Sequence, residues 1–348
     1  MGNWMTGIRR TDSAGMGGDA APPDTALRAP FGRITMETAA REQVTALVRS
    51  ASPGRPLLVA LLMATRPRQW IKNLLVFAAP MAAGVLSRPV DMGRTGVAAV
   101  ILVVASAGVY LINDVMDAPA DRLHPVKRRR PVASGEVPAT VAATAGSAAL
   151  MLALTASAEL AGAALVVVIA AYTTISVSYS LWLKRQAVIE LACVSSGFIL
   201  RAIAGGVAAG VVVSPWFMLV TSAAALLVVA GKRTAEQGTL SAAAPSHRSV
   251  LNRYPAAFLP AVRIIAGSVA IISYALWAFG RDARIGTHYA DEVVFQLSIL
   301  PFVMGVLLVE LTVEDGGGMA PEEMALSNRT LQVLGLACVT LIAVGVYR

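Results

Sequence analysis

The chain has 348 residues, of which 56% are hydrophobic and 14% are charged, and its mean hydropathy is +0.65. This composition excludes an ordinary soluble globular protein and is typical of a polytopic membrane protein. The net charge of +8 does not indicate a nucleic-acid partner, because Lys and Arg in membrane proteins mark cytoplasmic loops and meet anionic lipid headgroups. Cys193 and Cys338 both lie in apolar stretches, which favours small buried residues over a disulfide or a metal pair.

The first 53 residues are polar, contain Gly, Pro and Arg, and lack an apolar core. This pattern does not fit a secretory signal peptide. We expect residues 1–53 to form a disordered cytoplasmic extension in which 35–50 has the pattern of a short helix. Residues 54–348 then form the membrane domain. Whether that domain forms a homo-oligomer is left open by the sequence.

Apolar stretches close to the ~20 residues that cross a bilayer recur nine times after the extension. They cover 69–87, 95–113, 139–158, 161–181, 188–212, 215–231, 258–279, 293–311 and 330–347. The first stretch contains Pro80 and starts among several bases. We therefore expect its helix to begin earlier, near Leu57, with the basic turn facing a cavity. The sequence predicts an all-α polytopic membrane protein with nine transmembrane helices.

The distribution of Lys and Arg predicts how these helices are oriented. With the N-terminus inside, most bases after the extension fall in the internal loops 114–138, 182–187, 232–257 and 312–329. We therefore expect a multi-pass protein of the plasma membrane with a cytoplasmic N-terminus and an external C-terminus. The polar segments then face the cytoplasm, where Mg2+ and phosphorylated metabolites are found.

The segment 113–131 carries the main functional signal. Asp114, Asp117 and Asp121 follow an apolar run at offsets that share one helix face. Three such charges repel one another, and Mg2+ neutralises them with oxygen ligands while carrying substrate phosphates. We predict a metal–diphosphate site here, although Pro119 disfavours a regular helix and should place Asp121 past a kink. The bases that follow suit the same phosphates and are Arg122, Lys127, Arg128, Arg129 and Arg130. A plain cytoplasmic loop explains these bases but not the acids.

Polar side chains at other helix ends predict the rest of the site. A basic helix flank explains the charges around Trp70 but not Gln69 and Asn73 on the same turns, so we favour a face of donors toward a cavity. Arg201 lies inside a span, where it needs a carboxylate or a phosphate, and Glu190 is too distant to supply it. The candidate substrate-binding residues are Gln69, Lys72, Asn73, Asn113, Arg122, Lys127, Arg130, Tyr179, Lys184, Glu190, Arg201, Lys232 and Arg233.

The pattern Asn113-Asp114-x-x-Asp117-x-x-x-Asp121 after a membrane helix resembles the first Asp-rich motif of the UbiA superfamily of intramembrane prenyltransferases. A longer pattern resembles the decaprenyl-phosphate phosphoribosyltransferase branch of that superfamily. It comprises Arg66-Pro67-x-Gln69-Trp70-x-Lys72-Asn73, Asp121-Arg122-x-His124-Pro125-x-Lys127-Arg128-x-Arg130-Pro131, Tyr179-Ser180-x-x-Leu183-Lys184, Gly197-Phe198-x-x-Arg201-Ala202 and Gly231-Lys232-Arg233. The loop at Lys232 lacks the second Asp-rich cluster of prenyl-diphosphate enzymes, which fits this branch.

The resemblance implies a UbiA-type helical bundle with a cytoplasm-facing polar cavity. It also implies Mg2+-dependent transfer of 5-phosphoribose from phosphoribosyl diphosphate to decaprenyl or another polyprenyl phosphate, with release of pyrophosphate, on the route to cell-wall arabinan. In that reaction Asp114, Asp117 and Asp121 hold the metal. Two alternatives remain: a prenyl transfer to an aromatic or lipid acceptor on the same fold, and a transporter of lipid phosphates. The lack of a visible internal repeat counts against the transporter.

Overall fold

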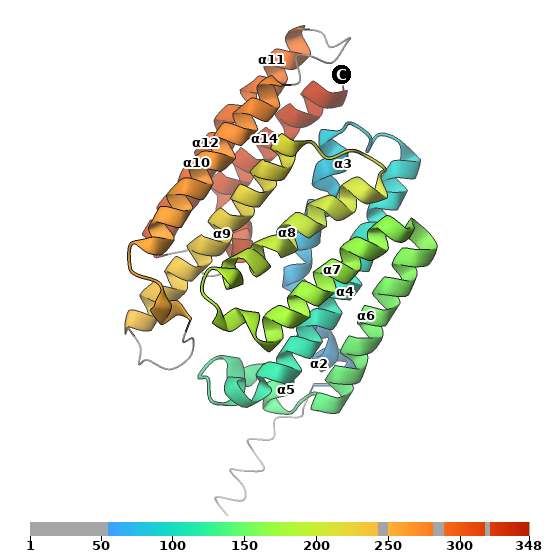
Figure 1. The fold of residues 1–348 in the computed structure, drawn as a ribbon, viewed down its shortest axis with the longest axis vertical. Coiled ribbons are helices and arrows are strands. Elements are labelled where there is room, and N and C mark those ends of the chain that lie inside the picture. Colours follow the sequence, from blue (N-terminus) through green and yellow to red (C-terminus); the bar gives the residue numbers. More distant parts are fainter. Residues whose placement is uncertain (1–54, 243–249, 281–288, 317–320, 348) are drawn as a thin grey trace, which may run out of the picture. The chain divides into compact units, whose positions relative to one another are not determined.

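The computed structural model describes residues 55–242, 250–280, 289–316 and 321–347. All regular elements within these ranges are helices (Figure 1). The predicted extension 1–53, with its expected helix at 35–50, lies outside the described residues.

Eight helical segments in the described ranges are long and apolar enough to cross a membrane. They are α4 (Pro89–Arg122), α6 (Ala139–Ala161), α7 (Ala163–Leu181), α8 (Ile189–Ala208), α9 (Pro215–Ala242), α10 (Phe258–Phe279), the pair α11 (Tyr289–Leu297) and α12 (Ile299–Glu314), and α14 (Arg329–Tyr347). These segments coincide with the last eight predicted stretches. The predicted all-α polytopic membrane architecture is therefore confirmed.

The first predicted stretch is not one helix. It consists of α2 (Leu57–Ala64), the 3-10 helix η1 (Pro67–Phe77) and α3 (Ala78–Ala82). The break lies at Arg66, whose φ of 57° is left-handed, and a residue before proline is disfavoured in the right-handed α conformation. The start near Leu57 is correct, the continuous helix over 69–87 is wrong, and the total of nine spans stays a prediction.

Pro119 does not break α4, contrary to expectation. The helix continues to Arg122, so Asp121 lies on the same helix as Asp114 and Asp117 and not beyond a kink. Pro119 removes only the bond that its own missing N–H would make, and it lies within four residues of the helix end, where little helix remains to be disturbed.

Small residues bring the helices that carry the site close together, as is common in membranes. A Cβ at Gly108 on α4 would lie 2.8 Å from the Gly146 carbonyl oxygen on α6. A Cβ at Gly205 on α8 would lie 1.7 Å from the carbonyl oxygen of Val76 in η1. Only glycine permits this approach, which holds the polar turns of η1 against α8.

Short helices occupy the connections between the long ones. The connections contain η2 (Lys127–Arg129), α5 (Pro131–Ser134), η3 (Leu183–Arg185), η4 (Leu251–Arg253) and α13 (Pro321–Ser327).

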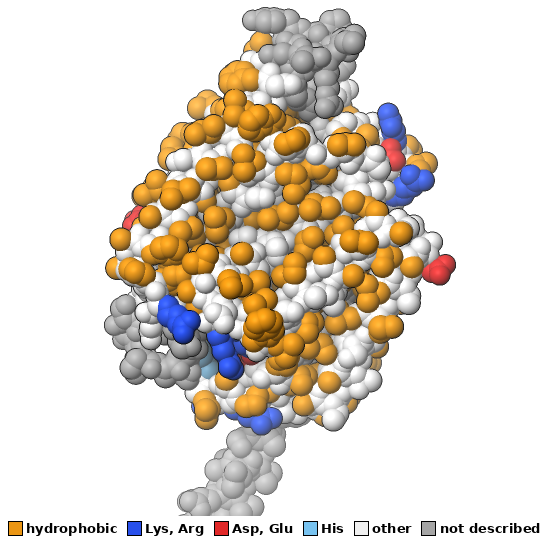
Figure 2. All heavy atoms as spheres, in the orientation of Figure 1, with side chains coloured by type: hydrophobic (Ala, Val, Ile, Leu, Met, Phe, Trp, Pro, Cys, Tyr) orange, Lys and Arg blue, Asp and Glu red, His pale blue; other side chains and the backbone are white. Residues whose placement is uncertain are grey.

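Figure 2 shows hydrophobic side chains across most of the visible face, with several Lys and Arg side chains toward its lower end. An apolar surface of this kind suits contact with lipid.

Candidate active site

A cavity of about 420 Å³ opens among η1, α4, α7, α8 and α9. Seven cationic side chains line it, against the two carboxylates of Asp117 and Glu236. The cations are Arg66, Lys72, Lys127, Arg130, Lys184, Arg201 and Lys232. Of the predicted site residues, those that line it are Lys72, Asn113, Asp117, Lys127, Arg130, Tyr179, Lys184, Arg201 and Lys232. The sequence-derived segments thus meet around one polar space.

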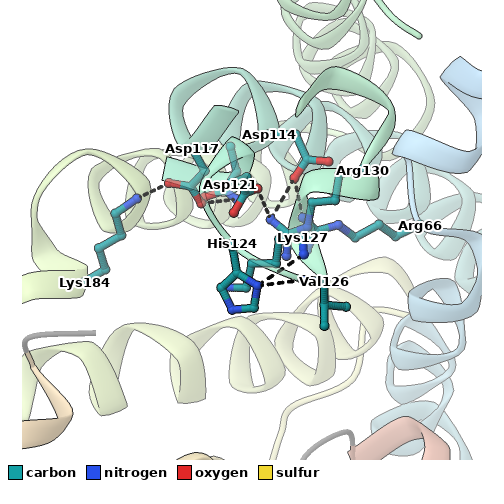
Figure 3. A network of polar contacts seen from close by, with 10 residues as sticks. Arg66, Asp114, Asp117, Asp121, His124, Val126, Lys127, Arg130 and Lys184 are labelled. Atoms are coloured by element: carbon teal, nitrogen blue, oxygen red, sulfur yellow. Dashed lines mark hydrogen bonds and ion pairs between the residues drawn. The ribbon is translucent and has the colours of Figure 1, made fainter. Parts of the chain in front are cut away.

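The three aspartates of α4 differ in their partners and in their exposure (Figure 3). Asp114 and Asp121 are buried, whereas 27% of the Asp117 side chain is exposed. Asp114 is paired with Arg66 and lies 3.5 Å from Arg130 Nη1, which also lies 2.6 Å from Asp121 Oδ2. Two acids therefore hold two arginines at the cavity wall, and the third acid faces the cavity itself.

Asp117 is held from two sides. Lys184 Nζ, from η3 at the end of α7, lies 2.5 Å from its Oδ1. Asn113, one turn earlier on α4, donates from Nδ2 to its Oδ2 at 3.0 Å. The pairing of α4 with η3 explains why the Asp-rich and Tyr-Ser-x-x-Leu-Lys segments belong to one site although 67 residues separate Asp117 from Lys184.

Some of the basic residues after Asp121 line the cavity and others do not. His124 Nδ1 accepts hydrogen bonds from the backbone N–H of Val126 and Lys127, which fixes the turn that leads into η2. Arg122 donates to the Ala133 carbonyl and does not line the cavity. Arg128 and Arg129 are exposed to the surroundings. The turn therefore directs Lys127 and Arg130 inward.

Arg201 lies deep on α8 and is only 5% exposed. Its Nε donates to Asn73 Oδ1 at 2.9 Å, its Nη1 to the Gly197 carbonyl at 2.6 Å and its Nη2 to the Tyr172 hydroxyl at 3.1 Å. The guanidinium also stacks over the Tyr172 ring, 5.0 Å from its centroid. Within the described residues, all of these partners are neutral, so the charge of this buried cation is not cancelled by a carboxylate.

Glu190 and Arg233, both candidate substrate-binding residues, bind one another. They are 1% and 2% exposed, and Arg233 donates to both carboxylate oxygens of Glu190 at 2.6 to 2.9 Å. Arg233 also contacts Glu236 at 2.7 Å and the Tyr179 hydroxyl at 3.2 Å. Neither Glu190 nor Arg233 lines the cavity. The pair ties α8 to α9 directly behind it.

Tyr254 supports this ion pair from the loop before α10. Its hydroxyl donates to Glu190 Oε1 at 3.4 Å and accepts from the backbone N–H of Val188 at 2.9 Å. Burial raises the pKa of Tyr254 above its ordinary value, so the neutral donor persists. Val188 has a φ of 68°, a strained conformation for a β-branched residue. The hydroxyl bond at this residue helps to fix the start of α8 and hence Glu190.

Tyr110 and Tyr172 line the cavity wall and were not predicted from sequence. Tyr110 and Arg66 lie beside one another, with the guanidinium carbon 4.9 Å from the ring centroid. Extending the Asn113–Asp117 face by one turn would have found Tyr110. Tyr172 has no such signal, because it meets Arg201 only through the packing of α7 on α8. Gln69, in contrast, was predicted as a site residue; it does not line the cavity but accepts a hydrogen bond from Lys72, which does.

The donor set suits a metal ion that arrives with its substrate. Among the described side chains, no three His, Cys, Asp or Glu residues gather into a metal-ligand group. Mg2+ is nevertheless often held by one or two carboxylates together with substrate phosphates and water. Asp117 and the amide oxygen of Asn113 offer such ligands at the cavity. Coordination by all three aspartates stays a prediction.

Comparison with known proteins places this chain in a family. Residues 74–308 match the UbiA prenyltransferase family. The chain belongs to the UbiA prenyltransferase family. This UbiA-family chain is 38% identical over 305 residues to a decaprenyl-phosphate phosphoribosyltransferase of Mycolicibacterium smegmatis, with 86% of this chain and 96% of the relative covered. A protein of the same name from Corynebacterium glutamicum is also 38% identical, over 307 residues, with 86% and 90% covered.

Solved structures share the UbiA fold with this chain. A UbiA homologue from Archaeoglobus fulgidus bound to DMAPP and Mg2+ superposes with a TM-score of 0.62 at 18% identity, covering 82% of this chain and 98% of that chain. At this identity the likeness shows the fold alone. The predicted family and UbiA-type helical bundle are therefore confirmed.

Proposed function

We propose that this chain transfers 5-phosphoribose from phosphoribosyl diphosphate to a polyprenyl phosphate, such as decaprenyl phosphate, and releases pyrophosphate. Its relatives named decaprenyl-phosphate phosphoribosyltransferase support this reaction because they are 38% identical over most of the chain. The donor's bond from C1 to the diphosphate oxygen breaks, and a phosphate oxygen of the lipid bonds to C1. That oxygen is already anionic, so the site does not need a strong general base.

One observation carries the proposal: seven cations line a single cavity, and only four carboxylates line it or pair with its arginines. A surplus of cations in a cavity between apolar helices is unfavourable unless anions enter it. A prenyl diphosphate brings anionic charge at one end and hydrocarbon at the other. A phosphoribosyl diphosphate is polar along its whole length, and its three phosphate groups suit cations from several helices.

The rim of the cavity suits the diphosphate of the donor. We use this name for the lining residues Asn113, Asp117, Lys127, Arg130 and Lys184. Asp117 and Asn113 are placed to hold Mg2+ that accompanies this group, and bound Mg2+ would neutralise the departing pyrophosphate. Lys184, Lys127 and Arg130 supply hydrogen-bond donors for the negative charge that develops on the same leaving group.

Asp114 and Asp121 act one layer behind the rim. Their contacts with Arg66 and Arg130 fix the two guanidinium groups before substrate arrives. Such preorganisation lowers the cost of aligning charges during the reaction. These two acids are thus proposed to position cations as well as to take part in metal binding.

We also propose that the protein lies in the plasma membrane with its cavity open to the cytoplasm. The turns η2 and η3 at the cavity mouth belong to segments rich in Lys and Arg, which favour the cytoplasmic side. The mouth then opens toward the soluble donor in the cytoplasm, while the acceptor reaches the cavity from the plasma membrane. The product would feed the synthesis of cell-wall arabinan.

The test is a product assay with the purified full chain in lipid nanodiscs. Labelled phosphoribosyl diphosphate, Mg2+ and decaprenyl phosphate should give a labelled lipid product, and omission of the lipid phosphate should abolish it. A parallel reaction contains labelled prenyl diphosphate with aromatic and lipid acceptors. A labelled product only in that second reaction would replace the proposal by an ordinary prenyl transfer. Movement of lipid phosphate across vesicles without any covalent product would favour a transporter.

A further inference from the structure

We infer that Arg201, with Lys72, forms an inner subsite for the 5-phosphate of the ribosyl donor and thereby selects a phosphoribosyl over a prenyl donor. The inference rests on the proposed function and assigns one part of its site. The rim then holds the diphosphate on C1, and the inner subsite holds the phosphate on C5, with the ribose between them.

The bonding of Arg201 points to an anionic ligand. A buried arginine is normally paired with a carboxylate, because an unpaired buried charge is costly. Here Asn73, Gly197 and Tyr172 orient the guanidinium but do not neutralise it. These three bonds use three of the five N–H groups of an arginine. The remaining donors suit the oxygens of a phosphate group.

Neighbouring groups reinforce the same subsite. Lys72 Nζ lies 5.9 Å from the ring centroid of Phe198, which is three residues before Arg201 on α8, and both cations line the cavity. Asn73 is buried, and its Nδ2 has no hydrogen-bond partner among the described residues. Two cations therefore approach the same part of the cavity from η1 and α8, which the Gly205–Val76 contact holds together.

The depth of Arg201 favours the donor over the lipid acceptor. Arg201 lies 12 residues after Ile189, or about 18 Å along α8, whereas Asp117 lies five residues, or about 8 Å, from the end of α4. A lipid phosphate is carried at the headgroup level, outside the hydrocarbon core. It needs only to reach C1 beside the rim, while a soluble donor can enter the cavity completely.

This arrangement also explains how a donor would be selected. With its diphosphate at the rim, a prenyl donor would direct hydrocarbon toward Arg201. Contact between an apolar chain and a buried, uncompensated guanidinium is unfavourable. A 5-phosphate at the same place supplies the missing charge. Arg201 therefore favours one donor and disfavours the other at a single position.

The experiment measures donor binding by calorimetry with the full chain in nanodiscs and Mg2+. Wild type should bind phosphoribosyl diphosphate about 10- to 100-fold more tightly than ribose 1-diphosphate, which lacks the 5-phosphate. Arg201→Gln should lose about the same factor toward phosphoribosyl diphosphate and almost none toward ribose 1-diphosphate. Arg94→Gln, at an exposed arginine of α4, is the matched control and should bind both donors as wild type does.

Two further measurements do not depend on the folding of Arg201→Gln. Lys72→Gln, at a half-buried position, should also weaken only the donor that carries a 5-phosphate. In wild type, ribose 5-phosphate should compete with the donor and ribose should not. Equal losses toward both donors, or a loss confined to binding of decaprenyl phosphate, would overturn the assignment. A wild-type protein that binds neither donor and makes no phosphoribosyl lipid would instead overturn the proposed function.

Discussion

Replacing Glu190 by glutamine separates two roles that this residue can have. The sequence pattern predicts a substrate ligand, whereas the structure pairs Glu190 with Arg233 behind the cavity wall. Glutamine keeps the size of the side chain but removes its charge. It also replaces one acceptor oxygen by an NH2 group, which would face the N–H donors of Arg233. We expect Glu190→Gln to lower stability and to leave donor affinity close to that of wild type.

The size of the effect follows from the contacts. Arg233 makes hydrogen bonds of 2.8, 2.9 and 2.6 Å with the Glu190 carboxylate. Removing one partner of a buried ion pair costs about 3–5 kcal/mol. Glu236 stays 2.7 Å from Arg233 and still compensates part of its charge, so we expect the lower end, about 3 kcal/mol.

Thermal unfolding in detergent, followed by tryptophan fluorescence, measures this loss as a fall of several degrees in apparent Tm. The control is Glu136→Gln, the same chemical change at an exposed residue, which should alter stability by about 0.5 kcal/mol or less. Calorimetry on the same samples gives the Kd for phosphoribosyl diphosphate. An unchanged Tm together with a tenfold weaker Kd would refute the structural role and restore Glu190 as a substrate ligand.

Three other substitutions or treatments test the site and its frame. Asp117→Asn should reduce turnover by at least about 100-fold, because the cavity loses the exposed carboxylate that faces the metal–diphosphate. A fully active variant with an unchanged Mg2+ requirement would contradict the metal assignment. Chelation of Mg2+ with EDTA should abolish turnover and added Mg2+ should restore it, whereas persistent activity in EDTA would exclude a metal requirement. Gly205→Ala should impair folding, since its Cβ would meet the Val76 carbonyl oxygen. The control Gly305→Ala has open space around the new Cβ and should be tolerated or stabilise α12 by up to about 1 kcal/mol. Equal expression and Tm of the two variants would show that η1 can move away from α8.

The sequence predicts most of the helices because each is an apolar run bounded by Pro, Gly or charged residues. α10 begins and ends at the predicted residues 258 and 279. The break at Arg66 was missed because it depends on one left-handed backbone conformation, which hydropathy does not reveal. At Pro119, a local rule about proline predicted a kink, but the position near a helix end limited its effect.

For the site, the sequence predicts which residues come together better than it predicts the contacts that each one makes. The spacing of acids and bases predicted a phosphate site, and nine of the candidate residues line the cavity. Sequence could not separate ligands from supporting residues, because that depends on contacts between distant segments. Arg233 stands beside Lys232 in the chain, yet only Lys232 lines the cavity. Helical periodicity gives two adjacent residues different directions but does not say which neighbouring helix each one meets.

Two buried arginines show what distinguishes a structural cation from a ligand-binding one. Arg233 and Arg201 are 2% and 5% exposed, so burial does not separate them. Arg233 has two carboxylate partners, Glu190 and Glu236, and carries no surplus charge toward the cavity. Arg201 is held by neutral groups in the described part of the chain. Its orientation is fixed while its charge is kept for a ligand, which is the combination that tight binding of a phosphate requires.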